Sequence, residues 1–92
     1  MTSVTVRIEG RVQGVWYRGW TVAEATARGL AGWVRNRRDG SVEALFHGST
    51  ASVEAMIAAC HVGPPSAHVL RVVVSPAAPP QKGWGFHQLP TL

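Results

Sequence analysis

The chain has 92 residues, of which 46% are apolar, and it carries a formal net charge of +4 at pH 7. This length allows one modest core, so we expect a single domain over residues 1–92, and with neither a spanning apolar run of roughly 20 residues nor a signal-peptide pattern we expect a cytoplasmic protein. The single cysteine excludes an internal disulfide, and the positive charge favours an anionic partner without choosing among nucleic acid, membrane surface and small phosphates.

The N-terminal third predicts a strand followed by a helix. Residues 4–9 alternate apolar and polar side chains, as a strand with one buried face requires, and we expect that strand to end at Gly10. The glycine in "RGL" lies where the following helix can stop, so that helix is predicted over about residues 19–29. Its apolar side chains recur near the helical spacing, at Trp20, Ala23, Ala27 and Leu30.

A hairpin and a second helix come next. The segments "AGWVRN" and "RRDGSVEALFHG" predict antiparallel strands near residues 31–37 and 41–47, joined by a tight turn at Asp39-Gly40. Ser49 or Thr50 can cap the second helix, which "GPP" forces to end by about residue 61. One face of that helix is apolar, and it carries Val53, Met56, Ile57 and Cys60.

The C-terminal third predicts one strong strand and one short strand. "HVLRVVV" at residues 68–74 favours a strand, the proline-rich segment 75–83 favours a loop, and "FHQL" favours a short closing strand. The order is therefore β-α-β-β-α-β. We expect an α+β fold of the ferredoxin-like class, an antiparallel sheet with two helices on one face.

The loop "EGRVQGVWYRGW", residues 9–20, has the composition of an anion site. A glycine-bearing turn from a strand into a helix presents several backbone N–H groups to one point, where the helix dipole is positive. Gly14 permits close approach of a ligand, and Arg18 opposes the dipole unless an anion lies between them. The loop matches neither common phosphate-binding glycine motif, so by itself it is equally consistent with a plain structural turn.

Three segments together resemble the acylphosphatase family. They are "GRVQGVWYR" at 10–18, "GLAGWVRNRRDGSVEALFHG" at 29–48 and "GPPSAHV" at 63–69, and the similarity extends to "GF" at 85–86. The predicted order of strands and helices is also that of the family. The resemblance therefore covers most of the chain.

The resemblance implies an enzyme that hydrolyses the carboxyl-phosphate bond of small acyl phosphates without a metal or cofactor and releases inorganic phosphate. By motif position, Arg18 corresponds to the phosphate-binding arginine and Asn36 to the asparagine that orients water. A monomer that binds neither nucleic acid nor membrane is the expected form. Backbone N–H groups are expected to hold the phosphate along the loop Gln13, Gly14, Val15, Trp16, Tyr17 and Arg18.

Two positions depart from the family pattern and bear on substrate fit. Tyr17 stands where the family commonly has phenylalanine, and Trp16 where a smaller residue is frequent. Trp16 and Trp84 are in predicted loops and are candidates to line the mouth that receives the acyl group, whereas Trp20 and Trp33 are expected in the core. Neither motif contains a side chain suited to be a general base, which leaves a phosphoryl oxygen of the substrate as the proton acceptor.

Structural interpretations compete at several of these residues. Judged from its neighbours alone, Asn36 is a polar strand end, and only the family resemblance favours a functional role. The arginines beside it are better explained by a solvated hairpin face, Cys60 by a buried thiol, and the four histidines form no cluster. The arginines in question are Arg35, Arg37 and Arg38.

Two other functions remain open from the sequence. "KGWGF" at 82–86 looks like the start of an RNA-binding RNP1 motif, but that motif belongs on a third strand followed by further elements, and here it lies near the C-terminus. A catalytically idle domain that binds acyl phosphate or carbamoyl phosphate, like those in some hydrogenase-maturation proteins, would retain the loop. Hydrolysis distinguishes an enzyme from both.

Overall fold

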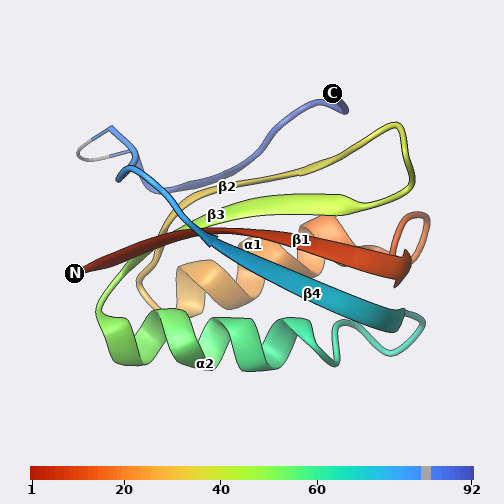
Figure 1. The fold of residues 1–92 in the computed structure, drawn as a ribbon, viewed down its shortest axis with the longest axis horizontal. Coiled ribbons are helices and arrows are strands. Elements are labelled where there is room, and N and C mark those ends of the chain that lie inside the picture. The colour runs from red at the N-terminus through yellow and green to blue at the C-terminus, as the bar shows by residue number, and fades with distance from the viewer. Residues whose placement is uncertain (82–83) are drawn as a thin grey trace.

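The computed structural model describes residues 1–81 and 84–92. Two helices cover one face of a five-stranded sheet (Figure 1). The predicted ferredoxin-like α+β class is therefore confirmed. In chain order the elements are β1 (Thr2–Arg11), α1 (Tyr17–Ala27), β2 (Ala31–Asn36), β3 (Val42–Gly48), α2 (Thr50–Cys60), β4 (His68–Pro76) and β5 (Phe86–Gln88).

The sheet has the strand order β4-β1-β3-β2-β5, and its fifth strand departs from the predicted antiparallel arrangement. The first four strands pair antiparallel, but β5 pairs parallel with β2. Because neighbouring strands alternate in direction along the order β4-β1-β3-β2, β2 points in the direction opposite to β4. The chain reverses its direction after β4, so β5 points in the same direction as β2. β5 is therefore parallel to β2 when it pairs with it at the edge of the sheet.

β1 does not end at Gly10 as predicted. It continues to Arg11, and its register against β4 shifts between Glu9 and Gly10, which leaves Leu70 of β4 as the extra residue of a β-bulge. Gly10 has φ 128°, and a Cβ there would lie 2.3 Å from the carbonyl oxygen of His68. The glycine is needed for close approach of two strands, and not to release the chain from the sheet.

The core lies between the sheet and the two helices. Tyr17, Phe46, Ile8 and Met56 are its largest fully buried side chains. Cys60 is buried among them, as predicted, and burial raises the pKa of its thiol to about 12. No helix among the described residues has the length and apolar character needed to cross a membrane.

Trp20 packs partly buried against the core, as predicted, but the same prediction for Trp33 is wrong. Its neighbour Val34 points into the core, so the alternation of the strand places Trp33 on the opposite face of the sheet. There the guanidinium of Arg35 lies 4.6 Å from the centre of the indole ring. A strand of this composition carries no local signal for which face the helices cover.

Candidate active site

The loop between β1 and α1 turns through two left-handed residues. Gly14 has φ 74°, and Trp16, the N-cap of α1, has φ 67° and ψ 24°. No side chain caps this helix end, and its first turn contains no acidic residue. α1 therefore has neither a capping side chain to accept from its first N–H groups nor a carboxylate to offset the positive end of its dipole.

The first backbone N–H groups of α1 have no helical acceptor. The N–H of Trp20 donates to the carbonyl oxygen of Trp16 at 3.0 Å, which is the first bond of the helical ladder. The N–H groups of Tyr17, Arg18 and Gly19 precede that bond, so they have no carbonyl one turn earlier within the helix. These donors and the helix dipole make the start of α1 attractive to an anion.

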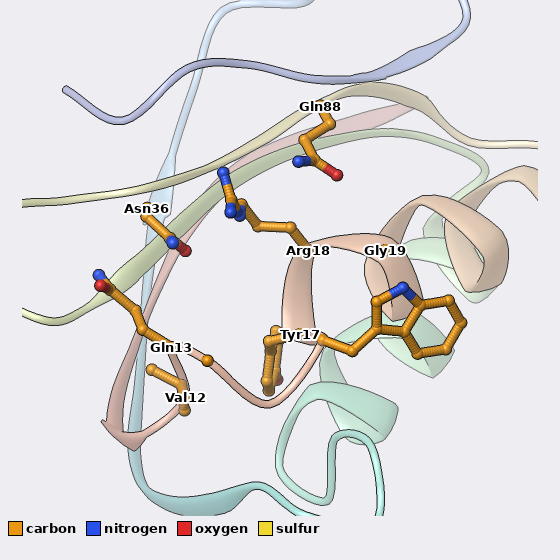
Figure 2. A pocket seen from close by; sticks show the side chains of 9 residues that line it. Val12, Gln13, Tyr17, Arg18, Gly19, Asn36 and Gln88 are labelled. Carbon is orange, nitrogen blue, oxygen red and sulfur yellow. The ribbon is translucent and has the colours of Figure 1, made fainter.

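Asn36, the last residue of β2, faces this helix end. Its Oδ1 is buried and has no hydrogen-bond partner among the described residues. Figure 2 shows the Arg18 side chain extending from the start of α1 into the space between Asn36 and Gln88. No carboxylate of the described residues pairs with Arg18, so a cation, the unpartnered amide oxygen of Asn36 and free N–H groups face one space.

That space is a cavity of about 130 Å³. Pockets for drug-sized molecules are roughly 300–1,000 Å³, so this one suits a compact anion. Six of the seven predicted site residues line it, whereas Val15 instead packs partly buried against the core. The described residues that line it are Val12, Gln13, Gly14, Trp16, Tyr17, Arg18, Gly19, Asn36 and Gln88.

Gln88 is a lining residue that the sequence did not reveal. It lies on β5 opposite Val34 of β2, and Val34 and Asn36 share a face because they are two residues apart. The parallel pairing thus brings Gln88 to the same side of the sheet as Asn36. The N–H of Leu92 also donates to the carbonyl oxygen of Asn36 at 3.1 Å, so the C-terminal segment holds the backbone of this residue.

The side chain of Gln13 joins the loop to the β2–β3 hairpin. Its Nε2 donates to the carbonyl oxygens of Arg37 at 2.7 Å and of Ser41 at 2.9 Å. The same Ser41 oxygen accepts the N–H of Arg37 at 2.9 Å, which closes the hairpin directly after Asn36. Gln13 therefore fixes the distance between the loop and the strand end that carries Asn36.

Tyr17 anchors the other side of the loop. Its hydroxyl donates to the carbonyl oxygen of Cys60 at 2.6 Å, and its ring meets Trp20 edge-on with centroids 5.2 Å apart. Burial, reinforced by the neighbouring Cys60 thiol, raises the pKa of the Tyr17 phenol. The tyrosine at this position thus ties the loop to α2 and stays neutral.

Two of the three neighbouring hairpin arginines have a carboxylate partner. Glu43 accepts from Arg35 at 2.8 Å and from Arg37 at 3.0 Å. Burial acts to raise the pKa of the Glu43 carboxyl, but the hydrogen bonds and charges of the two arginines outweigh it, and the pKa is lowered. Arg38 is exposed beside the turn and does not line the cavity. These residues form a hairpin surface, separate from the cavity.

Comparison with known proteins assigns the chain to a family. A sequence model of the Acylphosphatase family matches residues 4–88. An acylphosphatase of Rhodospirillum rubrum is 62% identical over 92 residues, 100% of each chain. The crystal structure of an acylphosphatase from Bacillus subtilis superposes with a TM-score of 0.91 at 34% identity, covering 97% of this chain and 99% of that one. Full-length HypF, in its phosphate- and nucleotide-bound form, superposes with a TM-score of 0.81 at 25% identity over 98% of this chain and 12% of its own. The chain belongs to the acylphosphatase family.

Proposed function

We propose that the protein hydrolyses acyl phosphates at the cavity between the start of α1 and the end of β2. The observation that carries the proposal is the convergence of the Arg18 guanidinium, the free N–H groups of α1 and the unpartnered Asn36 Oδ1 on one small space. Each of these groups is suited to one part of a phosphoryl group and its attacking water. Membership of the acylphosphatase family supports the same activity.

The phosphoryl group binds to the positive side of the cavity. The Arg18 guanidinium stays protonated at physiological pH and donates two parallel hydrogen bonds to adjacent phosphoryl oxygens. The N–H groups at the start of α1 donate to the remaining oxygen. These donors are already in place before reaction, so they stabilise the charge on the equatorial oxygens in the transition state without reorganising.

Asn36 positions the attacking water. A buried acceptor without a partner costs about 1–3 kcal/mol, and a water that donates to Oδ1 removes this cost. An amide has no useful pKa, so Asn36 orients the water and does not deprotonate it. The oriented lone pair of the water attacks phosphorus in line with the departing carboxylate.

The chemistry balances without a protein base. The bond from water oxygen to phosphorus forms as the bond from phosphorus to the carboxyl oxygen breaks, and the electron pair leaves with the carboxylate. Of the described residues that line the cavity, only Tyr17 and Arg18 have ionisable side chains; burial raises the pKa of the Tyr17 phenol, and a guanidinium does not act as a base at physiological pH. The proton of the water therefore passes to a phosphoryl oxygen, and the products are a carboxylate and inorganic phosphate.

Release of phosphate from acetyl phosphate tests this proposal. We expect turnover that inorganic phosphate inhibits competitively, because product and substrate share the cavity. Phosphate binding without turnover would identify the idle binding domain instead. Retention of RNA that weakens steeply with salt, without hydrolysis, would identify the RNA-binding alternative.

The closing strand weighs against that RNA-binding alternative. Residues 82–83 of "KGWGF" lie outside the described residues. Phe86 begins β5 at the edge of the sheet, and its ring stacks on Phe46 in the core with centroids 5.7 Å apart. An aromatic residue that reads bases must expose its face on the open side of the sheet, which Phe86 does not do.

A further inference from the structure

The rim of the cavity has one large apolar side chain. Among the nine lining residues, those that are exposed are Gly14, Trp16 and Gln88. Gly14 has no side chain and Gln88 is polar, so Trp16, at 68% exposure, supplies the apolar part of the rim. A cavity of about 130 Å³ has little room beyond a phosphoryl group, so the acyl group of a bound substrate lies at this rim.

The backbone and the neighbouring glycine hold the Trp16 indole in place. Trp16 is the one non-glycine residue with positive φ in the part of the chain that the structure describes. An ideal Cβ on Gly19 would lie 2.1 Å from its Nε1 and 2.6 Å from its Cε2, so the indole lies against the backbone where any side chain would displace it. A bulky residue in this unfavourable conformation, exposed to solvent, costs stability and calls for a function.

From these contacts we infer that Trp16 is a specificity-determining residue, which forms an apolar wall for the acyl group and favours acyl phosphates with a flat, aromatic acyl group. This inference rests on the proposed function. An indole packs well against another aromatic ring, whereas an acetyl group presents only one methyl to it. Among the described residues, no acidic or basic side chain joins Trp16 on the exposed part of the rim, so none of them favours a charged acyl group there.

The test compares benzoyl phosphate with acetyl phosphate in Trp16→Ala and Trp16→Phe. Alanine and phenylalanine carry the same penalty for positive φ, so the two variants differ mainly in the aromatic ring. We expect the ratio of kcat/KM for benzoyl over acetyl phosphate to fall about threefold to tenfold in Trp16→Ala and to stay within about twofold in Trp16→Phe. Leu70→Ala, an exposed apolar truncation on β4, serves as the control and should leave the ratio unchanged.

A binding measurement separates this inference from the proposed activity. Titration calorimetry with phenylphosphonate and methylphosphonate gives the same aromatic preference without turnover. An unchanged preference in Trp16→Ala, by kinetics or by titration, would overturn the inference and leave the hydrolytic function intact. If the wild type hydrolyses neither acyl phosphate, the proposed function fails, while the titration still decides whether Trp16 forms the wall.

Discussion

Arg18 lines the cavity with Asn36, and Arg37 follows Asn36 in the chain; both arginines are partly buried, but they differ in their partners. Arg37 donates to Glu43 at 3.0 Å, and Arg35 donates to the same oxygen at 2.8 Å. Arg18 has no carboxylate partner in the described part of the chain and stands at a helix end whose dipole repels it. On the hairpin surface one carboxylate pairs with two arginines, whereas the cavity offers Arg18 no carboxylate among the described residues.

This difference separates stability from function within one small region. Unpaired groups that face a cavity cost free energy in the unliganded fold, and a ligand recovers it on binding. Paired groups contribute to the fold whether or not a ligand is present. Substitutions in the cavity should therefore lower activity without lowering stability, and substitutions on the hairpin surface should lower stability with little effect on activity.

The largest effect is expected from Arg18→Ala. Loss of the guanidinium should lower kcat/KM for acetyl phosphate by roughly 10²- to 10³-fold, because it removes a preorganised donor to the phosphoryl oxygens. The free energy of unfolding should rise by about 0.3–1 kcal/mol, since a cation leaves the helix N-terminus. Steady-state kinetics and urea denaturation measure both.

The matched control for Arg18→Ala is Arg37→Ala. It should lose less than about threefold in kcat/KM and up to about 1 kcal/mol in stability. Equal losses of activity in the two variants would show that general positive charge, and not the placement of Arg18, supports turnover.

Asn36→Ala should come next, with kcat lowered about 10²-fold and the inhibition constant of inorganic phosphate changed far less. The reason is that Asn36 orients the water and does not hold the phosphoryl group. Because Oδ1 makes no hydrogen bond within the described protein, its loss should leave the thermal midpoint close to that of the wild type. A large rise in the inhibition constant at intact kcat would instead assign Asn36 to phosphate binding.

Gln13→Ala tests the link that the Gln13 side chain makes between the loop before α1 and the β2–β3 hairpin. It removes both hydrogen bonds to the hairpin, so the strand end that carries Asn36 should shift relative to the loop and kcat should fall about tenfold. Gln13→Glu keeps the size but places oxygens against two carbonyls, and it should lose at least as much. Unchanged kcat in both variants, measured with stopped or continuous phosphate release, would show that this link does not position Asn36.

The smallest effect concerns the pH response of the paired side. The pKa of Glu43 is lowered in the fold, so its contribution to stability is present above the ordinary value of 4.5 and is lost as the pH falls through the folded-state value. The difference in unfolding free energy between wild type and Glu43→Gln should thus be at most about 1 kcal/mol near pH 7 and should shrink on acidification. Urea titrations between about pH 3 and pH 7 measure it, and a difference that grows toward low pH would contradict the assignment.

Features with a local pattern were predictable from the sequence. The alternation in β1 and the apolar stripe of α2 follow directly from side-chain periodicity, and the glycine-bearing loop before α1 indicates an anion site. Arg18 and Asn36 were identified through motif positions, and the structure places both at one cavity. The order of the elements then led to the correct fold class.

Features that depend on distant pairing were not predictable. Gln88 reaches the cavity because β5 pairs parallel with β2, and the Gln13 amide finds its acceptors 24 and 28 residues away. The bulge at Gly10 depends on the approach of β4, and the outward position of Trp33 depends on which face the helices cover. None of these contacts produces a periodic pattern in the sequence around the residues that make it.

The assembly of the cavity from the loop, the end of β2 and the closing strand has a consequence for refolding. β4 and β5 lie at opposite edges of the sheet, so the segment after β4 must cross the sheet before β5 pairs with β2 and Leu92 donates to Asn36. Pairing of segments so far apart in the chain carries a high entropic cost of loop closure. Turnover should therefore recover during refolding no earlier than the docking of β5, so hydrolysis reports that this edge of the sheet is complete.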